Sequence, residues 1–376
     1  MVKLQVGVIG GGVAGLSVAF RLARHGHEVA IYDPHPAMGS SWAAAGMLAP
    51  ASEANFSEIA LLRLMQHSNE LWPEFAAEIE KVSGIMVDLR SDGTIIIGYE
   101  PNDGRDLERM AEFQRELGIE VTRLTRSQLK ELEPEIGGPF AFAAMIDSDI
   151  QLDNRSLMNS LIRANESLGV SIFRKAVTSL KNDDSGNYAM ILDDNSEVRY
   201  EIVIVAPGAY LSDISGLPDV VTKSIKPVKG QILRVKATSP RLLRHVIRSK
   251  TFGKTLYMVP RNNGEIVIGA TQEEVGFDTT AKVRPIAEML TNAALLLPGI
   301  GEADFSEHIV RFRPGSFDNS PIVGRWEDSN LFLCLGHFRH GILLSAAISK
   351  YLALAIEAGK EPLELEEFSS ARLHAN

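Results

Sequence analysis

A glycine-rich turn between an apolar strand and an amphipathic helix is the feature that most constrains this chain. Residues 4–9 predict a buried strand, and residues 13–25 predict a helix with one apolar face. The pattern G-x-G-x-x-G lies between them, with its glycines at Gly10, Gly12 and Gly15. The first permits a tight turn, the second lets a pyrophosphate approach the backbone, and the third lets helix and strand pack closely. Because the helix N-terminus also attracts phosphate, the pattern predicts a dinucleotide-binding unit.

An acidic residue at the end of the next strand strengthens this interpretation. Residues 28–32 predict a second strand, and Asp33 follows it, 18 residues beyond Gly15. A carboxylate at this point accepts hydrogen bonds from ribose hydroxyls and disfavours a 2′-phosphate. The structural alternative is a glycine-rich turn without a ligand, and the motif alone leaves FAD and NAD open as cofactors.

The size and charge of the chain argue against several other classes. Its 376 residues exceed what one hydrophobic core usually supports, so two domains are expected. A net charge of −10 argues against a nucleic-acid partner. Cys334 is the single cysteine, which excludes an intramolecular disulfide and a multi-cysteine zinc site, so we expect no metal and a reducing, cytoplasmic location. No segment is predicted to cross a membrane.

The rest of the chain alternates between helical and strand patterns. Helices are predicted at 56–82, 104–117, 153–168, 282–297 and 341–358. Strands are predicted at 85–90, 94–98, 170–173, 188–193, 201–206, 225–236, 244–249, 255–260, 265–270, 305–312 and 331–335. The turn residues Ser91, Asp92 and Gly93 predict that the first two of these strands form a hairpin.

These patterns predict an α/β protein with a discontinuous nucleotide-binding domain. The nucleotide-type signals lie near the start, middle and end of the chain, and hairpin-like strands fill the two gaps. We therefore expect a Rossmann-like domain with an inserted α+β substrate domain, built on a sheet rich in antiparallel pairs. The Rossmann-like domain is assigned 1–82, 144–224 and 301–376, and the substrate domain is assigned 83–143 and 225–300.

A run of small residues from Ser40 to Pro50 favours FAD over NAD. The run reads S-S-W-A-A-A-G-M-L-A-P and carries hydroxyls at its head. Such a backbone suits close contact with a large planar ring, whereas a packed core prefers larger side chains. A helical alanine run is an equally good interpretation of the residue types alone.

Several motifs together resemble the D-amino acid oxidase superfamily, and within it the glycine oxidases. The glycine turn, the acid at Asp33 and the small-residue run match that family, and four further motifs extend the resemblance over essentially the whole chain. The small-residue run and the last of the four motifs are specific, whereas the glycines are not. The four are K-P-V-K-G-Q-I at 226–232, Y-M-V-P-R at 257–261 with I-G-A-T at 268–271, R-P-G at 313–315, and G-H-F-R-H-G-I-L at 336–343.

The resemblance implies a set of contacts to FAD. It places Val13 and Ala14 at the pyrophosphate, Asp33 at the ribose and Val177 at the adenine. It places further residues along the cofactor, chiefly at the flavin: Ser40, Ser41, Ala45, Gly46, Met47, Gly208, His337, Phe338, Arg339, His340, Gly341, Ile342 and Leu343. Cys334 does not lie where related sarcosine oxidases tether their flavin, so FAD is expected to be non-covalent.

The resemblance also implies a substrate site and a reaction. Arg313 would bind a substrate carboxylate with its two-pronged guanidinium, Tyr257 would donate its hydroxyl to the same group, and Arg339 would lie beside the substrate. The expected reaction is oxidative deamination of glycine, sarcosine or a small D-amino acid by hydride transfer to flavin N5. Its products would be an imine and then an oxo acid, ammonia and hydrogen peroxide. Surface salt bridges for the arginines, and a half-buried strand position for Tyr257, are the structural alternatives.

Some residues depart from the glycine oxidase pattern, and other functions stay open. The departures are Thr255, Gln272, Ala49 and Arg311, and they bear on substrate choice.

The leading hypothesis is an oxidase that supplies a thiazole precursor for thiamine, uses oxygen as its electron acceptor and forms a homo-oligomer. The first alternative is a flavin dehydrogenase subunit, like that of hydrogen cyanide synthase, that passes electrons to a membrane or acceptor partner. An NAD(P)H-dependent monooxygenase would need a second nucleotide motif, and a non-catalytic FAD protein would not need Arg313 or Tyr257.

Overall fold

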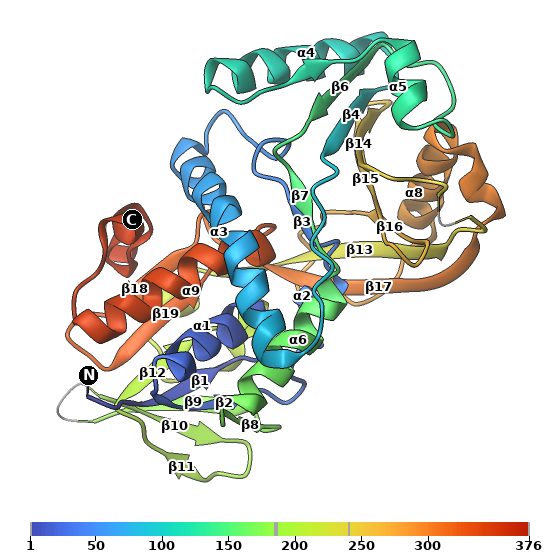
Figure 1. Ribbon diagram of the computed structural model, residues 1–376. Coiled ribbons are helices and arrows are strands. Elements are labelled where there is room, and N and C mark those ends of the chain that lie inside the picture. Colours follow the sequence, from blue (N-terminus) through green and yellow to red (C-terminus); the bar gives the residue numbers. More distant parts are fainter. Residues whose placement is uncertain (1, 184–186, 240, 375–376) are drawn as a thin grey trace.

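The computed structural model describes residues 2–183, 187–239 and 241–374, and it has a mixed α/β fold (Figure 1). Within these residues, the nucleotide-type strands form a six-stranded sheet. Its neighbours run parallel except at one edge, where β18 is antiparallel to β19. The strand order is β18 (Ile322–Arg325), β19 (Leu331–Leu335), β12 (Ile202–Val205), β1 (Gln5–Ile9), β2 (Glu28–Tyr32) and β8 (Ser171–Phe173).

Different layers cover the two faces of this sheet. Helices lie on one face, and a small antiparallel sheet lies on the other (Figure 1). Along β1 the side chains alternate, so Val8 belongs to the helical core and Ile9 to the opposite one. The helices are α1 (Val13–Arg24), α3 (Ile59–Ser83), α6 (Asn154–Ser167) and α9 (Gly341–Ala358). The small sheet contains β9 (Val177–Asn182), β10 (Tyr188–Leu192) and β11 (Glu197–Val198).

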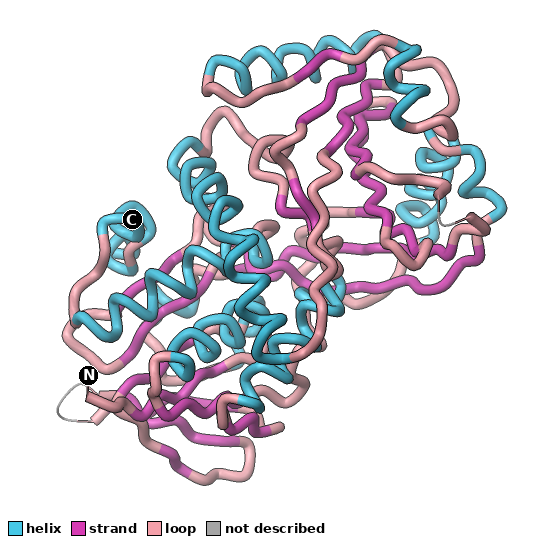
Figure 2. The backbone as a smooth tube through the Cα atoms, in the orientation of Figure 1, coloured by secondary structure: helices cyan, strands magenta, loops and turns pink. Residues whose placement is uncertain are grey.

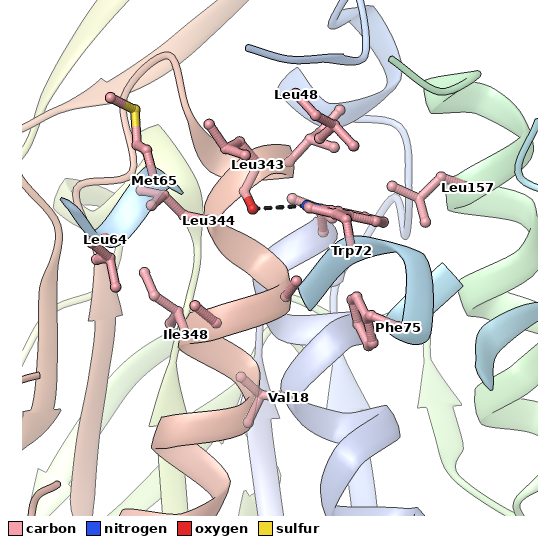
Figure 3. Close-up of a cluster of buried hydrophobic side chains, with 14 of the residues drawn as sticks. Val18, Leu48, Leu64, Met65, Trp72, Phe75, Leu157, Leu343, Leu344 and Ile348 are labelled. Atoms are coloured by element: carbon pink, nitrogen blue, oxygen red, sulfur yellow. Dashed lines mark hydrogen bonds between the residues drawn. The ribbon is translucent and has the colours of Figure 1, made fainter. Parts of the chain in front are cut away.

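The helix α9 lies at the centre of the helical layer. Figure 3 shows Leu343 of α9 beside Trp72 of α3, whose Nε1–H donates to the Leu343 carbonyl at 2.8 Å. This carbonyl belongs to the first turn of α9. α9 is long and apolar enough to span a bilayer, contrary to the expectation that no segment would be, but most of it is buried against α1 and α3. Its apolar composition is therefore that of a core helix.

A second, larger sheet forms the other half of the fold. Its neighbours are antiparallel except β14 and β4, which run parallel. Its order, within the described part of the chain, is β17 (Asp304–Gly315), β13 (Lys226–Lys236), β16 (Glu265–Gly269), β15 (Lys254–Pro260), β14 (Val246–Thr251), β4 (Thr94–Gly98), β6 (Phe142–Ile146) and β5 (Thr122–Arg123). Nearby helices are α4 (Pro101–Glu116), α5 (Arg126–Leu132) and α8 (Val283–Leu296). Shorter elements include α2 (Ser40–Ala43), β3 (Met47–Leu48), β7 (Ile150–Gln151) and α7 (Asp219–Thr222).

The predicted hairpin at 85–98 is wrong. Residues 85–90 form no strand, and Arg90 makes only an isolated bridge to Gln151. The second half of the prediction holds, because β4 occupies the predicted range. All its residues are buried, and it pairs with β6 and β14 instead. A fully buried strand needs a partner on each side, and the partly exposed segment before it does not supply one.

The chain passes repeatedly between the two sheets (Figure 2). Two segments that the sequence division assigns to the nucleotide-binding domain pair with the second sheet: β17, and most of β6. The division into two domains therefore stays a proposal, in which we now count β6 and β17 with the second sheet.

Candidate active site

The glycine turn leaves a free helix end facing a large cavity. Gly10 has a φ of 102°, and a Cβ there would collide with the carbonyl of Ala206. A Cβ at Gly15 would collide with the Gly10 carbonyl, so Gly15 serves the close packing of α1 on β1. A Cβ at Gly12 would meet no atom at close range, so there is open space next to the backbone at this position. The first turn of α1 carries no acidic side chain, so no carboxylate of the helix itself competes with an anion at its positive end.

This cavity has a volume of about 780 Å³ and extends from the glycine turn to the start of α9. Asp33 lines it at the end of β2, where its carboxylate accepts hydrogen bonds from the backbone N–H groups of Gly11 (2.6 Å) and His35 (2.7 Å). Val177 and Gly208 line it as well. The Ser41 hydroxyl accepts a hydrogen bond from the Val13 N–H at 3.1 Å. Small residues, a helix N-terminus and a carboxylate that can accept from ribose hydroxyls are the groups that a dinucleotide site requires.

Buried polar side chains hold the small-residue run along this cavity. Only Ser40–Ala43 is helical, so the helical alternative applies to those four residues alone. Asn154 donates to the carbonyls of Ser41 (2.9 Å) and Trp42 (2.8 Å), and Arg261 donates to that of Ala45 at 2.5 Å. Burial lowers the pKa of Arg261 to about 10. These hydrogen bonds fix the backbone of residues 41–45 along the cavity wall, where the small residues Ala44, Ala45 and Gly46 leave room for a planar ring.

The turn before α9 forms the far wall of the same cavity. Phe338 has a φ of 44°, and its N–H donates to the Pro314 carbonyl at 3.0 Å, which joins the turn to β17. His337 lines the cavity, and burial lowers its pKa to about 4, so it is neutral at pH 7. The positive end of α9 begins at Gly341, which also lines the wall.

A second cavity, of about 650 Å³, adjoins the first. Glu53, Tyr257, Arg313 and Arg339 line both cavities, so they stand at the junction. Arg313 lies on β17, and its Nη1 donates to the Thr271 carbonyl at 3.0 Å.

Two glycines leave the space that these junction side chains occupy. A Cβ at Gly230 would fall 2.6 Å from Nη1 of Arg313, and a Cβ at Gly269 would collide with the Tyr257 ring. Burial lowers the pKa of Arg313 and raises that of Tyr257. At neutral pH the pair therefore presents a cation and a hydroxyl donor, which together suit a carboxylate.

Most of the predicted site residues line these cavities, and three do not. Gly15, His340 and Leu343 lie behind the wall: Gly15 in the helix–strand contact, His340 in an ion pair with Glu53, and Leu343 in the core. The remaining predicted residues line the first cavity: Gly10, Gly12, Val13, Ala14, Asp33, Ser40, Ser41, Ala45, Gly46, Met47, Val177, Gly208, His337, Phe338, Arg339, Gly341 and Ile342, together with Tyr257 and Arg313.

The structure adds residues that motif reasoning missed. Glu53 pairs with Arg248 and His340 at the junction, and Lys250 lines the second cavity. These side chains belong to no recognisable motif. One signal was available for Arg248, a charged residue within the expected strand 244–249, whereas Lys250 lies just beyond that range. Of the departures from the family pattern, Thr255 and Gln272 line the second cavity, Arg311 lines the first, and Ala49 is buried away from both.

Comparison with known proteins identifies the class. The family of FAD dependent oxidoreductases (DAO) matches residues 5–355, and the chain belongs to it. It is thus a flavoprotein oxidoreductase that uses FAD.

Individual relatives agree with this class. The chain is 31% identical to glycine oxidase of Geobacillus kaustophilus, over 98% of this chain and 97% of the relative. It is 26% identical to hydrogen cyanide synthase subunit HcnC of Pseudomonas aeruginosa, over 97% of this chain and 95% of that one. The crystal structure of the Geobacillus glycine oxidase superposes with a TM-score of 0.88, covering 98% of this chain and 99% of the other.

Proposed function

We propose that this protein oxidises the amine of a small amino acid, namely glycine, sarcosine or a small D-amino acid, with oxygen as the final electron acceptor. The observation that carries the proposal is the position of Arg313 and Tyr257 at the junction of the two cavities. A cation and a hydroxyl there would hold a substrate carboxylate beside the cofactor site. Similarity to glycine oxidase over nearly the full length supports the same substrate class.

The first cavity would hold FAD without a covalent bond. The free end of α1 would bind the pyrophosphate, Asp33 the ribose, and the 40–47 segment with the 337–342 turn would enclose the ring system. Cys334 also lines this cavity, but burial raises the pKa of its thiol to about 12, so it is no nucleophile. When bound, FAD would accept the substrate α-hydrogen as a hydride at N5, and oxygen would reoxidise it to give peroxide.

The protein's own residues would bind and orient the amino acid. Arg313 would bind both carboxylate oxygens, and Tyr257 would donate its hydroxyl to one of them. Holding the carboxylate fixes the α-carbon relative to the flavin site, which lowers the entropic part of the barrier. We assign no general base: His337 lines the first cavity and not the second, and Glu53 is engaged by Arg248 and His340. The amine would therefore react in its neutral form, and the imine would hydrolyse to an oxo acid and ammonia, or methylamine in the case of sarcosine.

Anaerobic flavin bleaching across a panel of amines tests the proposal. The purified holoenzyme is mixed with glycine, sarcosine, D-alanine and ethylamine, and the loss of the oxidised flavin absorbance is followed by stopped flow. We expect bleaching by the amino acids and little by ethylamine, which lacks a carboxylate. Air should then restore the colour and yield peroxide. Reoxidation only by an added dye would contradict the oxidase assignment in favour of a dehydrogenase.

A further inference from the structure

The second cavity is larger and more positive than glycine requires. Its volume of about 650 Å³ falls in the range of about 300–1,000 Å³ that is typical of pockets for drug-sized ligands. Five cationic side chains and two carboxylates line it among the described residues, an excess of three positive charges. The cations are Arg109, Arg248, Lys250, Arg313 and Arg339, and the carboxylates are Glu53 and Asp106.

The existing ion pairs do not neutralise this excess. Glu53 is shared between Arg248 and His340, and Asp106 is shared between Lys250 and Arg109. Neither Arg313 nor Arg339 pairs with a carboxylate in the parts of the chain that the structure describes. One substrate carboxylate at Arg313 would therefore leave the cavity with net positive charge, which favours a second negative group on the ligand.

The strand register shows where the second group would bind. On the antiparallel pair β14–β15, Tyr257 lies opposite Arg248, and Thr255 lies opposite Lys250. Residues directly opposite project from the same face, and all four line the cavity. The Thr255–Lys250 pair is one side-chain step further along the strands, about 7 Å from the Tyr257–Arg248 pair. Two carboxylates separated by three chain atoms match such a step.

We propose that the preferred substrate is an amine with two carboxylates, the second held by Lys250 and Thr255. The ammonium of Lys250 supplies the charge, and the hydroxyl of Thr255 donates a hydrogen bond. Asp106 opposes the anion, but Lys250 and Arg109 together outweigh it. This inference rests on the proposed function for the reaction, because the first carboxylate is the one assigned to Arg313.

The test compares N-(carboxymethyl)glycine with its monoamide, which has the same shape but lacks the second charge. In the holoenzyme, kcat/KM for the dicarboxylate should exceed that for the monoamide by at least about 10-fold, as expected for one charged hydrogen bond. Lys250→Met should bring the ratio to about 1, and Lys250→Arg should restore part of it. Thr255→Val should reduce it less.

The matched control is Lys254→Met. Lys254 lies on the same strand as Thr255, but it pairs with Glu288 of α8 outside the cavity. Its replacement should leave the ratio at the wild-type value. An equal fall in Lys254→Met would show a general charge effect and would overturn the assignment, as would a wild-type ratio near 1.

A binding measurement separates this inference from the proposed function. Thermal shift of the anaerobic holoenzyme reports binding of the dicarboxylate and the monoamide whether or not either is oxidised. Selective binding of the dicarboxylate that is lost in Lys250→Met, without oxidation of any amine, would overturn the proposed function and support the second site. Oxidation of glycine without selective binding of the dicarboxylate would support the proposed function and overturn the second carboxylate site.

Discussion

Oε2 of Glu53 lies 3.1 Å from Nδ1 of His340, the residue that precedes α9. The other carboxylate oxygen pairs with Arg248 of β14. One side chain, on the loop before α3, therefore connects the helical layer to the second sheet at the junction of the two cavities. Burial alone would raise the pKa of Glu53, but Arg248 and the hydrogen bond with His340 outweigh it and hold this pKa well below 4.5.

Replacing Glu53 with glutamine should destabilise the protein by about 1–3 kcal/mol at pH 7, because charged hydrogen bonds are lost. Since the folded-state pKa is lowered, the stabilisation is present above the ordinary value of 4.5 and declines as the pH falls below it. Urea unfolding at pH 7 and pH 4 measures the change. Glu70→Gln, at an exposed position of α3, is the control. Equal losses at both pH values would refute the charge explanation.

Asp149 should give the opposite pH dependence. Its carboxylate accepts hydrogen bonds from the N–H groups of Ala51 (3.1 Å) and Ser52 (3.2 Å), yet burial raises its pKa from 3.8 to about 6. The folded state then binds a proton that the unfolded state releases, so stability decreases as the pH rises from about 4 to 6. Asp149→Asn should remove up to about 3 kcal/mol of this change. Unfolding curves at pH 4.5, 5.5 and 7 should show a flatter profile, and an unchanged slope would contradict the prediction.

Arg313→Ala should lower kcat/KM for amino acids by on the order of 100-fold or more while the flavin spectrum is retained. A substrate carboxylate would lose its charged partner in a buried site, which costs about 2–5 kcal/mol. Arg313→Lys should restore only part, since an ammonium cannot bind both oxygens in the same geometry. Stopped-flow measurement of flavin reduction by glycine and by ethylamine tests this prediction. The rate with glycine should fall far more than the rate with ethylamine, which lacks a carboxylate. Equal losses for both amines would mark Arg313 as structural.

Asp33→Asn should weaken FAD binding by about 10- to 100-fold, as expected for a charged hydrogen bond of about 1.5–3 kcal/mol. The carboxylate also accepts two backbone N–H groups, which an amide oxygen can partly replace, so the fold should persist. Fluorescence titration of the apoprotein with FAD measures the affinity. The control variant Glu28→Gln, at the other end of β2, should bind FAD with the same affinity as the parent protein. An unchanged affinity in Asp33→Asn would place the ribose contact elsewhere.

Denaturation should release free FAD into solution. The thiol of Cys334 is buried with a pKa of about 12, and it lies 3.8 Å from Nε2 of His337. Cys334→Ala should therefore retain flavin in the same ratio as the parent. Colour that remains with the acid-precipitated protein, or a flavin adduct in its mass spectrum, would refute non-covalent binding.

The sequence alone predicted those elements of the fold that are specified by residues close together in the chain. The glycines of the first turn, the acid at Asp33 and the apolar periods of α1, α6, α8 and α9 act over a few residues, and each predicted the element or position that the structure has. The Y-M-V-P-R and R-P-G motifs indicated Tyr257 and Arg313 through their resemblance to the D-amino acid oxidase superfamily. These two residues, 56 positions apart, line a common junction because β15 and β17 lie in one sheet.

The tertiary structure decided what depends on pairing between distant segments. Residues 85–90 looked like half of a hairpin, yet buried β4 pairs with β6 and β14. Glu53, Arg248 and Lys250 belong to no motif, and only the packing of a loop on a sheet brings them to one cavity. A charge pattern along one strand is local, but the balance of charges in a cavity is a sum over segments that meet only in the folded chain.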